Sequence, residues 1–133
     1  KNILNFIKKK KIKRIVNWKI GYKNNREISK LFNDADLVVL PYKNIDASGI
    51  LNLCFAFRTP VLVSDLKSFK YDYKSNDGIT YAKKNNINDF ANKISHLINS
   101  KKNYLKQLKN IKKKNKKINK WNTVSENIIN FIR

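Results

Sequence analysis

Two continuous apolar runs, DLVVL at residues 36–40 and TPVLVSD at residues 59–65, constrain the fold more than any other feature of the sequence. Each run has the length of a strand and lacks the alternation of a half-exposed strand, which is typical of parallel strands covered on both faces. Between them, SGILNLCFAF at residues 48–57 predicts a helix. A strand, a helix and a second strand in this order predict a βαβ unit with a parallel sheet.

The rest of the chain continues the alternation of strands and helices. We expect further strands at residues 14–20 (RIVNWKI) and 78–83, and helices at residues 2–10, 24–35, 87–100, 101–120 and 121–133. Asn24 or Asn25 is the expected N-cap of the second helix, and an Asn-Asp-Gly turn precedes the strand at residues 78–83. The pattern predicts an α/β fold in which helices cover both faces of a parallel sheet. No boundary is visible, so residues 1–133 are expected to form one domain.

The composition is strongly basic, with a formal net charge of +21 from 30 basic and 9 acidic residues. Such a charge fits a polyanionic partner. It also fits the amino-acid usage of an AT-rich genome, because 26 of the basic residues are lysine and only 4 are arginine. A single cysteine excludes an internal disulfide, and no apolar run reaches the ~20 residues of a membrane span. We therefore expect a cytoplasmic protein.

The loop after the first apolar run is the candidate site. Ligands of open parallel sheets bind beyond the carboxyl ends of the strands, where residues 42–48 are expected. A helix that starts near Ser48 would direct the N–H groups of Gly49, Ile50 and Leu51 into this rim, which suits phosphate. Asp46 adds a carboxylate that could accept a hydrogen bond from a sugar hydroxyl. The same residues also fit an ordinary helix cap, and spacing alone leaves both interpretations open.

Residues 21–65 resemble the C-terminal half of GT-B-type glycosyltransferases of the large retaining family 4, also called group 1. The residues in step with the family pattern are Gly21, Ile28, Leu31, Ala35, Asp36, Pro41, Gly49, Ala56, Pro60, Val61 and Asp65. Residues 76–100 and 118–132 are similar to later parts of the same domain, including its closing helix with Trp121. The resemblance implies a Rossmann-like domain that binds a nucleotide-sugar in the cleft between two such domains.

The resemblance also implies roles for individual residues. The family carries an E-x7-E motif, whose first Glu contacts the donor sugar and whose second holds the ribose. Asp46 stands at the first position and is the candidate catalytic residue. Cys54 stands at the second position, a departure that affects nucleotide affinity or choice because a thiol is a weak acceptor. The other expected donor-binding residues are Tyr42, Ser48, Gly49, Ile50 and Leu51. The family's glycine-rich turn is replaced here by Leu66, Lys67 and Ser68.

The resemblance therefore predicts glycosyl transfer from a nucleotide-sugar to a saccharide or lipid-linked acceptor, with no cofactor and no metal. The family's first strands and its N-terminal domain precede the matching part, so we expect the chain to act only together with such a domain. Without these first strands, the sheet would expose strand edges that normally lie inside it, and such edges would permit self-association. The alternative is a non-catalytic or basic module. The Lys-rich residues 101–120 could contact an anionic membrane peripherally, whereas nucleic acid is disfavoured because no aromatic stacking platform is evident.

Overall fold

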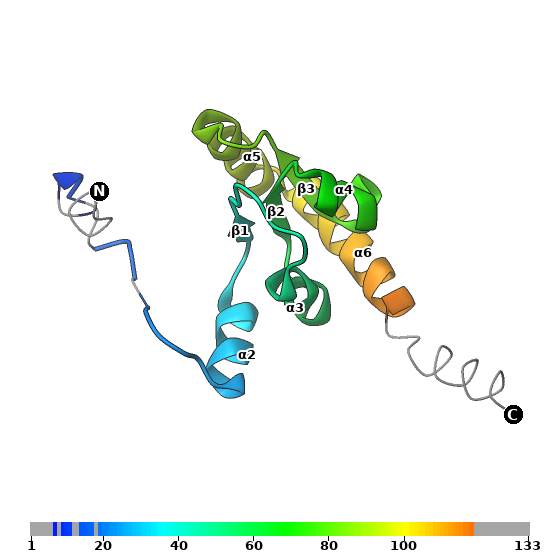
Figure 1. Ribbon diagram of the computed structural model, residues 1–133, viewed down its shortest axis with the longest axis horizontal. Helices are drawn as coiled ribbons and strands as arrows, with labels where there is room; N and C mark the ends of the chain where they lie inside the picture. Colours follow the sequence, from blue (N-terminus) through cyan, green and yellow to red (C-terminus); the bar gives the residue numbers. More distant parts are fainter. Residues whose placement is uncertain (1–6, 8, 12–13, 18, 119–133) are drawn as a thin grey trace, which may run out of the picture.

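The computed structural model describes residues 7, 9–11, 14–17 and 19–118, and its centre is a three-stranded parallel sheet (Figure 1). In chain order the elements are α2 (Asn25–Asp34), β1 (Val38–Leu40), α3 (Gly49–Phe57), β2 (Val61–Ser64), α4 (Lys67–Asp72), the 3-10 helix η1 (Ser75–Asp77), β3 (Ile79–Ala82), α5 (Ile87–Asn99) and α6 (Lys101–Ile118). The spatial order of the strands is β1-β2-β3, so each strand pairs with the next one in the chain. The predicted parallel α/β fold is confirmed.

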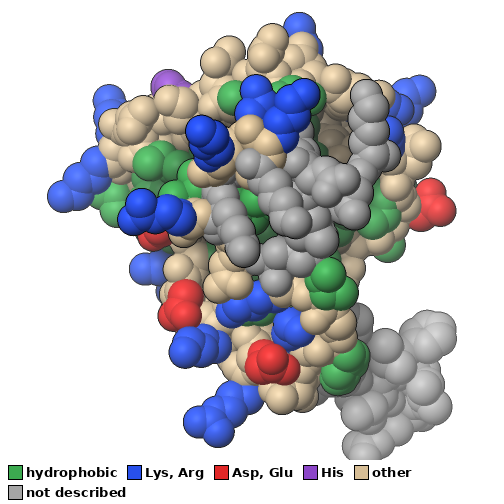
Figure 2. Space-filling model, turned by 90° about the vertical axis from the view of Figure 1, so that its left-hand side faces the viewer, with side chains coloured by type: hydrophobic (Ala, Val, Ile, Leu, Met, Phe, Trp, Pro, Cys, Tyr) green, Lys and Arg blue, Asp and Glu red, His purple; other side chains and the backbone are tan. Residues whose placement is uncertain are grey.

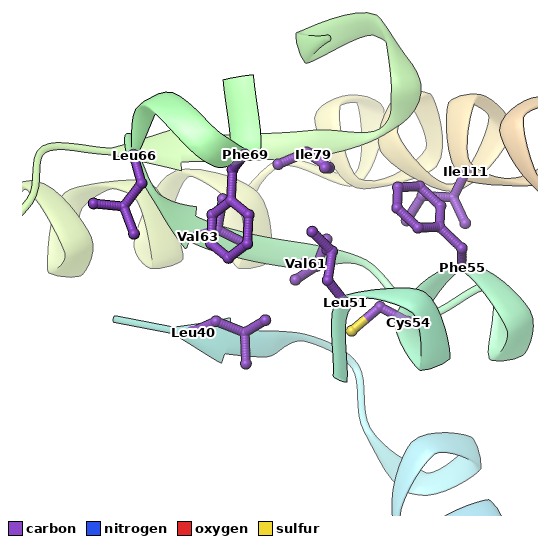
Figure 3. Packing of buried hydrophobic residues seen from close by; sticks show 10 residues of the cluster. All are labelled: Leu40, Leu51, Cys54, Phe55, Val61, Val63, Leu66, Phe69, Ile79 and Ile111. Atoms are coloured by element: carbon purple, nitrogen blue, oxygen red, sulfur yellow. The ribbon is translucent and has the colours of Figure 1, made fainter. Parts of the chain in front are cut away.

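Helices cover both faces of the sheet, because the successive apolar residues Val61, Leu62 and Val63 of β2 must be buried on alternating faces. On one face, strand residues pack with α3, α4 and α6 in the core cluster shown in Figure 3, which comprises Leu40, Leu51, Cys54, Phe55, Val61, Val63, Leu66, Phe69, Ile79 and Ile111. On the opposite face, Leu62 and Ala82 pack against Phe90 of α5. Successive residues of β2 thus enter different clusters, and all four of its residues are buried.

Two carboxamides fasten α6 to the rest of the core. The Nε2 of Gln107 donates to the carbonyl oxygens of Val61 and Gly78, both at 2.8 Å. The Nδ2 of Asn115 donates to the carbonyl of Phe55 at 2.7 Å. These bonds satisfy buried carbonyls at the starts of β2 and β3 and at the end of α3, so they fix how α6 is rotated about its axis.

Most predicted elements are present, and the N-cap is Asn24. Its side chain accepts from the N–H of Glu27 at 2.9 Å, and the Glu27 carboxylate accepts in return from the N–H of Asn24 at 3.0 Å. The expected turn before β3 is also confirmed, with Gly78 at φ +94. The expected closing helix at residues 121–133, with Trp121, lies outside the described residues.

The strand predicted at residues 14–20 is wrong for the residues that are described there, because none of them is in a strand. Ile15 and Ile20 are 82% and 72% exposed. Without burial of these side chains, nothing offsets the entropy cost of ordering an extended segment. The short helix α4 was not predicted, since a single pair of apolar residues, Leu66 and Phe69, is too weak a periodic signal.

Candidate functional site

The loop that follows β1 leads into a hollow of about 420 Å³ at the carboxyl ends of the strands. The hollow is lined by residues that follow each strand in turn: Asn44, Ile45 and Asp46 after β1, Asp65, Leu66, Lys67 and Ser68 after β2, and Lys84 after β3. The hydroxyl of Ser68 donates to the carbonyl of Ile45 at 2.7 Å, which ties the first loop to the second. The rim predicted from the sequence is therefore a real concavity.

Asp46 brings an exposed carboxylate to this hollow. Within residues 19–118, no hydrogen bond or ion pair engages it. Nearby Asp65 differs, because its carboxylate accepts from the N–H of Lys84 at 2.8 Å and lies 3.5 Å from the Nζ of Lys70. The hydrogen bond from Lys84 and the charge of Lys70 lower the pKa of the Asp65 carboxyl. Asp65 thus holds the loops together, and Asp46 remains available to a ligand.

The start of α3 supplies backbone donors beside this loop. The hydroxyl of Ser48 accepts from the N–H of Leu51 at 3.2 Å, so Ser48 is the N-cap and the Leu51 donor is already occupied. The N–H groups of Gly49 and Ile50 have no acceptor within the helix, as in every first turn. A Cβ at Gly49 would meet no atom within 4 Å, and Ile50 is 44% exposed. Two of the three predicted donors therefore have no partner within the helix and lie at an exposed helix start.

Tyr42 and Cys54 lie differently from the other candidates. The ring of Tyr42 is half-buried and packs against Phe69, with 6.2 Å between the ring centroids. Cys54 is 0% exposed and lies on the inner side of α3 among the core residues labelled in Figure 3. Burial raises the pKa of the Cys54 thiol to about 12, so it stays protonated. Of the predicted site residues, the structure places Asp46 in the hollow and Ser48–Ile50 beside it along the chain, whereas Cys54 does not reach it.

The hollow also contains Lys67 and Lys84, two residues that were not among the candidates from the sequence. Both line the hollow and both are exposed. Lys67 is the first residue of α4, and Lys84 follows β3. Their shared position after successive strands was the available signal, because residues there converge on one edge of a parallel sheet. Together they add positive charge within the same hollow as the Asp46 carboxylate.

A second hollow, of about 630 Å³, lies near the same end of the sheet but on the α5 side. Val39, Pro41, Ile87 and Phe90 form its apolar wall, with Lys43, Asn85 and Asn86 around them. The carboxyl end of β1 thus separates a charged hollow from an apolar one. Within the described residues, no group of three or more His, Cys, Asp or Glu side chains could hold a metal ion, and no helix is long and apolar enough to cross a membrane.

Comparison with known families adds independent information. A family model described as "Glycosyl transferases group 1" matches residues 1–118, which include every described element and both hollows. Searches of the curated proteins and of the solved structures give no significant match.

Proposed function

Because the chain belongs to the group 1 glycosyltransferases, which catalyse glycosyl transfer, we propose that its charged hollow binds the sugar and diphosphate of a nucleotide-sugar donor. The observation that carries this proposal is the convergence of an available carboxylate, Asp46, with Lys67 and Lys84 at the carboxyl ends of all three strands. A carboxylate suits sugar hydroxyls, and ammonium groups suit phosphate oxygens. Both kinds of group are needed to hold a sugar that is linked to a diphosphate.

Each group has a role in this proposal. Asp46 accepts a hydrogen bond from a donor-sugar hydroxyl and orients the sugar. The N–H groups of Gly49 and Ile50 approach the diphosphate, helped by the positive end of the α3 dipole. Lys67 and Lys84 offset the phosphate charge. The proposal assigns no metal to this site.

The chemistry follows from this arrangement. The bond between the anomeric carbon and the diphosphate breaks, and a new bond to an acceptor hydroxyl forms. Negative charge then grows on the departing diphosphate, where the lysines and backbone donors stabilise it. The acceptor in this proposal is a saccharide or a lipid-linked acceptor, and the resemblance to GT-B enzymes assigns it to a second domain across the cleft.

Calorimetric titration with nucleoside diphosphates tests the proposal. Gly49→Val should abolish binding because its branched side chain shields the two free N–H groups. The variant should still fold, since nothing lies within 4 Å of the added Cβ. Lys67→Gln should weaken binding, whereas Lys74→Gln, a matched change at an exposed lysine outside the hollow, should not. Unchanged affinity in Gly49→Val would refute the assignment of the site.

The buried Cys54 favours one alternative, a non-catalytic member of the family. The position that carries the ribose-binding carboxylate in the family is here a protonated thiol inside the core. If the wild-type protein binds no nucleoside diphosphate at all, this alternative replaces the donor-binding proposal.

A further inference from the structure

The solvent-facing side of α6 is a band composed almost entirely of lysines. Among residues 101–116, whose side chains are described, eight are exposed. Seven of them are lysine, namely Lys101, Lys102, Lys106, Lys109, Lys112, Lys113 and Lys116, and the eighth is Leu105. At ~100° per residue these positions fall within an arc of roughly 140°, and at ~1.5 Å per residue they extend over about 22 Å. We call these seven residues the lysine ridge.

The opposite side of α6 shows that the ridge must face outward. Gln107, Ile111 and Asn115 are buried, and the two carboxamides are bonded to backbone carbonyls of the core. Lys114 lies outside the exposed arc and forms an ion pair with Asp77 at 3.0 Å. No aspartate or glutamate occurs anywhere in α6, so no acidic neighbour on the helix itself neutralises the ridge.

The general abundance of lysine does not account for the ridge. A compositional bias would place lysine on every exposed helix face, yet none of the exposed residues of α5 is lysine. The only lysine of α5 is the half-buried Lys93. On the face of the molecule shown in Figure 2, basic side chains are scattered and acidic ones lie among them. The concentration of lysine on one arc of α6 is therefore a property of that surface.

We propose that the lysine ridge docks the protein on an anionic lipid bilayer. Long, flexible lysine side chains spread over this arc can direct their ammonium groups to one plane along the length of the helix. Each lysine near an anionic surface contributes about 1 kcal/mol, and this attraction decreases with salt. Leu105 is 51% exposed within the ridge, which gives it one apolar side chain for the headgroup boundary. With so little apolar surface, the helix adsorbs to the bilayer without inserting deeply.

The same features disfavour nucleic acid as the partner. Proteins that bind single strands combine a positive groove with aromatic residues on which bases stack. The exposed arc of α6 has no aromatic residue and contains lysine in place of the arginine that reads bases bidentately. The ridge is also convex, so it offers no groove for a strand.

Vesicle sedimentation tests this inference independently of any donor. The wild-type protein should sediment with vesicles that contain phosphatidylglycerol and should not sediment with vesicles of pure phosphatidylcholine. Replacing Lys102, Lys109 and Lys113 by glutamine should weaken this binding by at least about tenfold. Glutamine has a similar helix propensity, and these side chains are exposed, so the fold should be retained.

A control variant separates the ridge from net charge. Glutamine at Lys30, Lys74 and Lys83 removes the same charge from exposed positions outside α6, and it should leave vesicle binding within about twofold of the wild type. Equal losses in both triple variants would overturn the proposal, because the binding would then follow overall charge. Binding of the wild type to RNA or DNA without binding to anionic vesicles would overturn it in favour of nucleic acid.

Discussion

The buried position of Cys54 leads to a prediction that opposes what the family pattern alone suggests. Since the family carries a glutamate there, the family pattern alone suggests that Cys54→Glu restores ribose binding. In the structure, however, the side chain at this position is 0% exposed within the main core cluster. We predict that Cys54→Glu strongly destabilises the fold and does not raise nucleotide affinity.

The size of the effect follows from the thiol itself. Burial raises its pKa from the ordinary 9.0 to about 12. Raising a pKa by one unit corresponds to ~1.4 kcal/mol, so a negative charge at position 54 costs about 4 kcal/mol more free energy than the same charge in water. The larger side chain adds about 1–3 kcal/mol of overpacking. The combined loss is a large part of the roughly 5–15 kcal/mol that stabilises a typical domain.

The dependence on pH distinguishes the charge from the size of the new side chain. Burial raises the pKa of a carboxyl in the folded state, so the charge penalty is absent at low pH and grows as pH rises above the unfolded value of ~4.3. Cys54→Gln adds nearly the same volume without an ionisable group. Urea unfolding followed by circular dichroism should thus show the two variants similar near pH 4 and Cys54→Glu much less stable near pH 7. Equal stability at both pH values, or tighter binding of a nucleoside diphosphate, would refute the burial argument.

Two further predictions concern stability. Gly78→Ala should lower the free energy of unfolding by about 2–4 kcal/mol, since Gly78 has φ +94 and the new Cβ would overlap Cγ1 and the backbone nitrogen of Ile111. Gly21→Ala is its control, with φ +92 but no neighbour within 4 Å, and should cost only about 1–2 kcal/mol in the same urea experiment. The Asp65 carboxyl has a lowered pKa in the folded state, so its contribution is complete above the unfolded pKa and is lost as pH falls. The wild type should therefore lose stability relative to Asp65→Asn in acid unfolding curves, and parallel curves would contradict the bond from Lys84.

The sheet and its helices could be predicted because their signals are local. The apolar runs of β1 and β2 and the cap at Asn24 are read from a few neighbouring residues, and all three are confirmed. The segment at residues 14–20 has a strand-like composition as well. A strand also needs a pairing partner and burial, however, and the sequence pattern shows neither. The missing partner and burial explain why the strand predicted at residues 14–20 is absent although its composition fits a strand.

The candidate site was predictable only in part, because part of it depends on contacts between residues that are distant in the sequence. The position of Asp46 after β1 follows from the general rule for parallel sheets, and the structure does place it at the rim. The same rule places Lys67 and Lys84 at that rim, but only the register of β2 and β3 brings these residues, distant in sequence, into one hollow with Asp46. The inward direction of Cys54 also follows from a local signal, because the helical spacing of the apolar residues predicts it on the inner side of α3, where it is buried with Leu51 and Phe55.

The two proposed surfaces are physically separate, and this makes them testable one at a time. Gln107 holds α6 at the residues that begin β2 and β3, whereas the charged hollow lies beyond the opposite, carboxyl ends of these strands. No residue of the lysine ridge lines the hollow. A surface contacted by the lysine ridge therefore does not need to involve the residues of the charged hollow. The ridge variant should lose vesicle binding and keep its affinity for nucleoside diphosphates, because the charges that it removes serve only the first of these functions.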